Sequence, residues 1–262
     1  MMKTATLLQL TALAALLNGC STASGVPEAP EIPAATVTRT QLPVTLDGKL
    51  DDAAWATTPG FELKPIDMYS GLPKREAARI ARDPYESAVV KFLYDDRYLY
   101  VAAALTDSDV TAYSDRDQEL LFRYGDLLEV FLYPEQGTWY WEIYAAPNGA
   151  RSSFFYPGGG QLGNWEFFTE KYLMKDFAVA SRIGGTRNNH NDRDNGWSTE
   201  MRIPLRELEK AGIRFAPGIP WRIMVSRYNF GAGLYRPQLS SFPPLPGPDF
   251  HLRQYYAPVV FR

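Results

Sequence analysis

The chain has 262 residues, with 27 Lys and Arg against 30 Asp and Glu, a formal net charge of −3 and no dense basic block. This balance argues against nucleic acid as a partner, because a nucleic-acid-binding surface needs clustered Lys and Arg. The only cysteine is Cys20, which excludes disulfides and multi-thiolate metal sites within the chain.

Residues 1–19 predict a secretory signal peptide. An apolar run over residues 6–17 follows the early charge of Lys3, and it is shorter than the ~20 residues that cross a bilayer. The run ends in Leu-Asn-Gly-Cys, which resembles the lipobox of bacterial lipoproteins and implies that Cys20 is lipid-modified. Ser21 after it implies the outer membrane as destination, and an ordinary secretory signal with a chance cysteine is the alternative.

Residues 20–41 are rich in Pro, Ala and Thr, with Pro27, Pro30 and Pro33 spaced by three. This composition predicts an extended, polyproline-like tether. A single domain is then expected over residues 42–262, which are enough residues for one sizeable hydrophobic core.

Apolar residues alternate with period two through much of residues 42–262, which is typical of β-strands between turns. Strands are predicted at 88–94, 98–106, 127–133, 139–145, 178–182, 197–203, 221–229, 239–242 and 259–262. Short helices are predicted at 51–57 and 205–211. The predicted fold is all-β: a two-sheet antiparallel β-sandwich with a few short helices. A doubly wound parallel sheet would need alternating strands and helices, which the pattern lacks.

Several sequence patterns resemble motifs of catalysis or metal binding, but each gives only weak evidence for such a function. The glycines at 158–163 match the dinucleotide-binding spacing, but without a βαβ unit they predict a surface loop. The two histidines, His190 and His251, lack metal-ligand spacing. The oxygen-rich run at 188–195 could bind Ca²⁺, although the arginines in and beside it favour an ordinary loop. No metal site is predicted.

Three acidic residues stand among apolar neighbours in predicted strands: Glu129, Glu142 and Glu200. A glycoside hydrolase needs two such carboxyl groups at a suitable separation. Strand alternation also places acidic side chains on a polar face without any catalytic purpose, and this is the favoured interpretation.

Six segments, taken in chain order, resemble carbohydrate-binding module family 9. They lie at 46–55, 90–101, 125–131, 147–149, 196–204 and 250–251. The resemblance implies an antiparallel sandwich that binds the end of a glycan between aromatic rings, with polar side chains fixing the hydroxyl groups. Stacking of this kind suits the flat faces of aromatic side chains.

The resemblance also implies site residues. The family clamps its sugar between two tryptophans, and this chain has Phe122 and Tyr124 near the first position and Phe242 and Phe250 near the second. Glu129 matches a polar ligand position of the family. Arg227 and Asn229 match further polar positions less closely.

The expected function is that of an outer-membrane-tethered carbohydrate-binding lipoprotein that captures poly- or oligosaccharide for catabolism without catalysis of its own. Expected partners are a glycan, the membrane through the lipid, and polysaccharide-degrading enzymes or transporters. The resemblance implies no catalytic cofactor and allows a structural calcium ion. One alternative is a surface glycoside hydrolase with a carboxylate pair. A second is a haem-binding, DOMON-type redox domain, in which Met224 and His251 would be the axial ligands.

Overall fold

A computed structural model of the chain describes residues 31–67, 71–80, 83–158 and 173–262. The predicted signal peptide, Cys20 and all but the first residue of the glycine-rich run at 158–163 lie outside the described residues. Residues Ile32–Arg262 form one unit.

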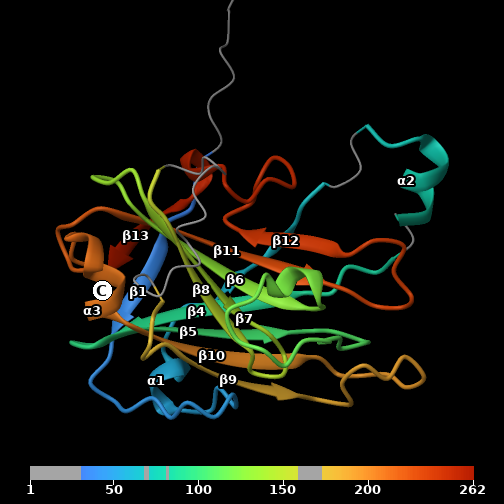
Figure 1. The fold of residues 1–262 in the computed structure, drawn as a ribbon, viewed down its shortest axis with the longest axis horizontal. Coiled ribbons are helices and arrows are strands. Elements are labelled where there is room, and N and C mark those ends of the chain that lie inside the picture. The colour runs from blue at the N-terminus through green and yellow to red at the C-terminus, as the bar shows by residue number, and fades with distance from the viewer. Residues whose placement is uncertain (1–30, 68–70, 81–82, 159–172) are drawn as a thin grey trace, which may run out of the picture. The chain divides into compact units, whose positions relative to one another are not determined.

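The described residues form thirteen strands, most of them in two layers (Figure 1). One layer contains β3 (Lys64–Pro65), β6 (Leu127–Pro134), β7 (Tyr140–Ala145), β8 (Arg151–Tyr156), β11 (Trp221–Asn229), β12 (Gln238–Phe242) and β13 (Ala257–Phe261). The other contains β2 (Phe61–Glu62), β4 (Ala88–Tyr94), β5 (Tyr98–Leu105), β9 (Ala178–Ile183) and β10 (Trp197–Pro204). The predicted all-β sandwich is confirmed.

Helices are few and short. They are α1 (Ala53–Ala56), α2 (Lys74–Ile80) and α3 (Leu205–Leu208), with 3-10 turns η1 (Leu121–Arg123), η3 (Glu209–Ala211) and η4 (Arg253–Tyr255). In the described part of the chain, no helix is long and apolar enough to cross a membrane. The predicted helices correspond to α1 and to α3 with η3, whereas α2 was not predicted.

Strand β1 (Ala35–Arg39) joins the two layers. Its first half pairs in parallel with β13, and its last two residues pair in parallel with β4. The sequence predicted a tether as far as residue 41, but the structure places a strand there. Ala35 and Val37 alternate into the core, and their packing outweighs the extended, unpaired conformation expected from the composition. The structured unit therefore begins at Ile32 rather than at residue 42.

The main hydrophobic core lies between the two layers, because alternate side chains of every strand point inward. Fully buried side chains such as Phe92, Val101, Trp141 and Trp221 fill it. A second cluster covers the outer face of the layer that contains β6. A third, around Trp55, packs α1 against the outer face of the layer that contains β4.

Glu200 of β10 serves the fold rather than a site. Its carboxylate accepts hydrogen bonds from the backbone N–H of Asp47 (3.0 Å) and Gly48 (2.9 Å) and from Nε1 of Trp55 (2.9 Å). These bonds hold the segment before α1 and the helix itself against the sheet. A buried carboxylate is tolerated here because three donors surround it.

Candidate functional site

Two buried glutamates and several aromatic rings share the outer face of the layer formed by β6, β7 and β11. Glu129 of β6 lies opposite Ser226 of β11 and Tyr144 of β7, and Glu142 of β7 lies opposite Phe131. Directly opposed residues share one side of a sheet. The set Phe122, Glu129, Phe131, Glu142, Tyr144, Tyr228 and Phe250 is called the aromatic–carboxyl face below.

The rings of this face touch one another in a continuous group. Phe122 stacks on Tyr228 with centroids 5.6 Å apart and an angle of 21° between the planes. Phe250 meets Tyr228 edge-on at 5.4 Å and lies 6.3 Å from Phe131. Phe122 and Tyr228 are only partly buried, so they form the accessible part of the group.

The two carboxyl groups of this face are buried. Glu129 is 1% exposed and Glu142 is 4% exposed. The Ser226 hydroxyl donates to Glu129 Oε2 at 2.7 Å, and the Tyr144 hydroxyl donates to Glu142 Oε1. Glu142 Oε2 is buried without a hydrogen-bond partner in the described part of the chain. A buried polar atom of this kind is rare in folded proteins, and the Tyr156 side chain also interacts with this carboxyl group.

Burial is the main influence on the acidity of the pair. It raises the pKa of Glu129 well above the usual range, the neighbouring Glu142 adds to the rise, and the hydrogen bond from Ser226 opposes it. Burial also raises the pKa of Glu142, which the charge of His251 opposes. Raised pKa values favour the neutral carboxylic acid, which can both donate and accept a hydrogen bond.

Three of the predicted sugar-binding residues, Phe122, Glu129 and Phe250, come together on the aromatic–carboxyl face. Tyr124, two residues beyond Phe122, is 39% exposed at the edge of this region. The structure thus brings Phe250 into one neighbourhood with Phe122, Tyr124 and Glu129, although it is far from these three in the sequence.

The structure does not bring Arg227 and Asn229 to that face. Both are buried on the opposite side of β11, because they share strand parity with the core residue Val225. The Arg227 guanidinium donates to Asp107 Oδ2 (3.2 Å) and Asn229 Oδ1 (2.8 Å), as well as to backbone carbonyls. This buried arginine network ties the loops at the strand ends together, and its burial keeps Arg227 and Asn229 away from a sugar at the surface.

Phe242 is also placed elsewhere. It is 5% exposed in the main core, with its ring 4.6 Å from that of Phe61. Phe242 lies directly opposite Val225 of β11, so both side chains point into the main core. We therefore leave Arg227, Asn229 and Phe242 out of the binding site.

Tyr144 and Tyr228 were not predicted as site residues from the sequence. Glu142 was interpreted as an acidic residue on the polar face of a strand and was not assigned to the binding site. A signal for Tyr144 was present, since Tyr140, Glu142 and Tyr144 alternate along β7 with the parity that faces Glu129. Tyr228 and Arg227 are adjacent in β11, so their side chains point to opposite faces of the sheet. Placing Arg227 in the site therefore excluded Tyr228 from it.

The oxygen-rich loop at 188–195 uses its side chains internally. Asp194 accepts backbone hydrogen bonds from Val110 (2.7 Å) and Thr186 (2.8 Å), and Asn188 bonds both backbone groups of Ala112. Among the described residues, no cluster of three or more His, Cys, Asp or Glu side chains is arranged to hold a metal ion. These contacts account for the loop without calcium.

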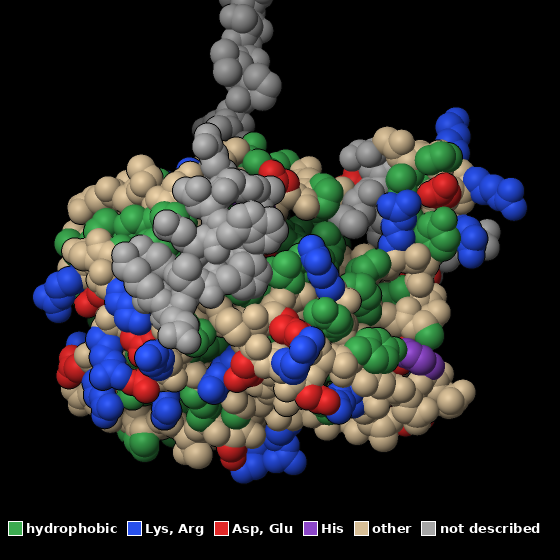
Figure 2. Space-filling view, in the orientation of Figure 1, with side chains coloured by type: hydrophobic (Ala, Val, Ile, Leu, Met, Phe, Trp, Pro, Cys, Tyr) green, Lys and Arg blue, Asp and Glu red, His purple; other side chains and the backbone are tan. Residues whose placement is uncertain are grey.

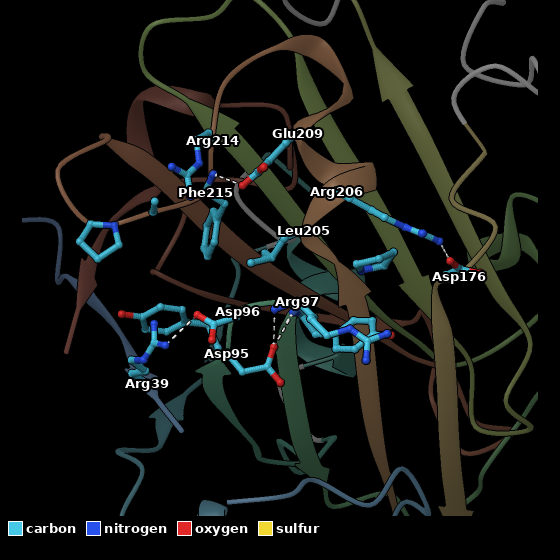
Figure 3. A pocket seen from close by; sticks show the side chains of 15 residues that line it. Arg39, Asp95, Asp96, Arg97, Asp176, Leu205, Arg206, Glu209, Arg214 and Phe215 are labelled. Carbon is cyan, nitrogen blue, oxygen red and sulfur yellow. Dashed lines mark hydrogen bonds and ion pairs between the residues drawn. The ribbon is translucent and has the colours of Figure 1, made fainter. Parts of the chain in front are cut away.

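Lys and Arg side chains gather with acidic ones on the side of the molecule where α3 lies (Figure 2). There a pocket of about 390 Å³ opens between the β4–β5 turn and α3 (Figure 3). Its charges are largely paired: Arg39 with Asp96 at 2.7 Å, and Arg206 with Asp176. None of the predicted sugar-binding residues lines it, so it is separate from the aromatic–carboxyl face.

Comparison with known proteins bears on the fold. The sequence matches no protein-family model and no curated protein. A solved structure of a proposed carbohydrate-binding protein from Bacteroides uniformis is similar, with a TM-score of 0.66 and 13% identity over 88% of this chain and 99% of that one. A family 9 carbohydrate-binding module from Caldicellulosiruptor kristjanssonii is also similar. Its complex with cellotriose has a TM-score of 0.52 and 12% identity over 87% of this chain and 93% of that one. Its complex with glucose has a TM-score of 0.53 and 12% identity over 87% of this chain and 95% of that one.

These likenesses confirm the predicted resemblance at the level of the fold: the chain is built as an all-β sandwich like those of family 9 modules. At this degree of identity the likeness shows the fold, and the ligand has to be inferred from the residues of the site.

Proposed function

We propose that the protein binds a neutral, hydroxyl-rich glycan on the aromatic–carboxyl face and carries out no chemistry on it. The observation that carries the proposal is the combination of stacked, partly exposed rings with two carboxyl groups whose pKa values are raised. Aromatic faces accept the C–H face of a sugar ring, and neutral carboxylic acids can exchange hydrogen bonds with its hydroxyl groups. The fold likeness to modules solved with glucose and cellotriose supports the same class of ligand.

The hydrolase alternative is less well supported. A glycosidase needs one carboxyl group as an acid and another that is ionised as nucleophile or base. Burial raises the pKa of both Glu129 and Glu142, which disfavours the ionised form that a nucleophile or base needs. The third candidate carboxylate, Glu200, is held by three donors of the fold, on the other layer.

The haem alternative is opposed by packing. Met224 is fully buried and lies opposite Phe131 on the neighbouring strand. The Phe131 ring also meets the His251 ring at 5.8 Å, and Nδ1 of His251 is hydrogen-bonded to the Tyr140 hydroxyl at 2.9 Å. A side chain that packs against both proposed ligands leaves no space for a macrocycle between them.

Binding can be tested by titrating the purified protein with β-linked oligosaccharides in a calorimeter. We expect dissociation constants from micromolar to millimolar, because a shallow site with few stacked rings gains roughly 4–8 kcal/mol. Tyr228→Ala and Phe122→Ala should each weaken binding by ~1 kcal/mol or more. Tyr235→Ala, an exposed tyrosine beside Arg79 and Arg236, is the matched control. Release of reducing sugar by the wild-type protein, lost in Glu129→Gln, would instead establish the hydrolase.

The proposal extends to the cell envelope. Cys20 would carry a lipid that tethers the domain to the outer membrane, where it would hold glycan for degrading enzymes or transporters. In cells that process lipoproteins, Cys20→Ala should abolish palmitate labelling and release the protein from the membrane fraction. Ser21→Ala is the control, and equal labelling of both variants would disprove the anchor.

A further inference from the structure

A pair of exposed tyrosines lies beside the aromatic–carboxyl face. Tyr113 is 59% exposed and Tyr124 is 39% exposed. Ala112 and Gly125 form an antiparallel bridge, and the backbone N–H of Tyr113 donates to the carbonyl of Tyr124 at 2.7 Å. The backbones of the two tyrosines are therefore neighbours, and both side chains are exposed.

The ring of Tyr113 is held in place through its hydroxyl group. The hydroxyl lies 2.8 Å from Nε2 of His190, whose Nδ1 lies 2.9 Å from both oxygens of Asp109. Asp109 is fixed in turn, since Oδ2 accepts the backbone N–H of Ala232 at 2.7 Å. An exposed ring that is already fixed loses less conformational entropy on binding than a free one.

The backbone under this pair is also fixed. The Asn188 side chain bonds the N–H (2.7 Å) and the carbonyl (3.0 Å) of Ala112. Gly125 has φ = 134°, and a Cβ there would lie 2.4 Å from the carbonyl oxygen of Thr111. Only glycine permits this close approach, which brings the backbone segments that carry the two tyrosines together.

The pair adjoins the aromatic–carboxyl face. Tyr124 follows Phe122 by two residues, so their Cα atoms are at most about 7 Å apart. Asp126, two residues further on, accepts the backbone N–H of Phe230 at 2.6 Å. The Phe230 ring stacks near-parallel to that of Tyr228, at 6.3 Å and 14°. Phe230 therefore links the aromatic–carboxyl face, through its ring, to the segment that carries Tyr124.

We propose that Tyr113 and Tyr124 form a second sugar-binding surface, so that the protein binds an extended oligosaccharide along the rings rather than a single sugar. The inference rests on the proposed function and deepens it by naming chain length as the basis of selection. Two flat rings, with polar groups of Tyr113 and His190 at one edge, suit stacking on a sugar ring with a hydrogen bond beside it.

The test compares trisaccharides and hexasaccharides of β-linked glucose, xylose and mannose by calorimetry with the purified protein. We expect the wild-type protein to bind the hexasaccharide of at least one series more tightly than its trisaccharide. Tyr113→Ala should weaken hexasaccharide binding about tenfold and leave trisaccharide binding unchanged. Tyr113→Phe keeps the ring and should retain most of the affinity, while Tyr235→Ala should change neither ligand.

Different failures have different meanings. If the wild-type protein binds no oligosaccharide, the proposed function fails and the extended site with it. If it binds both lengths equally, or if Tyr113→Ala leaves hexasaccharide binding intact, the extended site is disproved while the proposed function stands. Tyr124→Ala, which leaves the bond to His190 in place, gives the same comparison should Tyr113→Ala unfold, as judged by far-UV circular dichroism.

Discussion

Replacing Arg227 with methionine is expected to destabilise the fold by about 3–5 kcal/mol, the usual effect of removing one partner from a buried charge pair. Arg227 is fully buried and supports Asp107, Asn229 and three backbone carbonyls. Methionine fills much of the volume but donates no hydrogen bond, so these acceptors would remain buried without their donor. Urea unfolding at neutral pH measures the effect.

A matched substitution shows whether burial is the reason. Arg39 also pairs with an aspartate, Asp96, at 2.7 Å, but the two side chains are 47% and 82% exposed. Arg39→Met should therefore lower the free energy of unfolding far less than Arg227→Met does. Similar losses in both variants would show that the buried arginine network is not a special support of the fold.

Stability is expected to fall as the pH rises from about 4, the ordinary carboxyl pKa, through about 6 and above, with a decrease of roughly 5 °C or more in the thermal midpoint. Burial raises the pKa of Asp107 to about 6 even though Arg227 opposes the rise. It also raises the pKa values of Asp126, Glu129 and Glu142 above their usual ranges. A carboxyl group whose pKa is higher in the folded state binds its proton more tightly there. Its contribution is complete below the unfolded-state pKa and is lost as pH rises through the folded-state pKa.

Glu129→Gln measures how much of this fall in the thermal midpoint comes from the aromatic–carboxyl face. Glutamine keeps an acceptor for the Ser226 hydroxyl and is uncharged throughout this range, so the fall in midpoint should be smaller. Glu62→Gln alters an exposed carboxylate paired with Lys64 and serves as control. An unchanged slope in Glu129→Gln would mean that this carboxyl group does not titrate as the structure indicates.

Most strands could be predicted from the sequence because apolar residues alternate or cluster in short runs between turn residues. The predicted 88–94 and 221–229 coincide with β4 and β11. Strand β8 (Arg151–Tyr156) escaped prediction because its sequence groups the polar residues Arg-Ser-Ser before the aromatic residues Phe-Phe-Tyr instead of alternating them. Strand β1 does alternate, but the Pro- and Thr-rich composition around it concealed the pattern.

The site was partly predictable for a related reason. Phe122, Glu129 and Phe250 could be placed by their position in the family pattern. Arg227 was assigned to the wrong side of its strand, since the parity of Trp221, Ile223 and Val225 already places residue 227 on the inner side. The fixing of Tyr113 by His190 depends on loops 77 residues apart, and no local pattern reveals such a contact.

Strand β1 also determines how the domain would respond to mechanical force. With the proposed anchor at Cys20, a pull on the tether would reach the fold at Ala35 and act along β1, which pairs with β13 on one flank and β4 on the other. Hydrogen bonds between strands lie across the direction of such a pull, so they would be loaded in shear together rather than broken one at a time. Both layers would share the load, and the domain could hold a glycan fixed in a solid substrate while its anchor moves with the membrane.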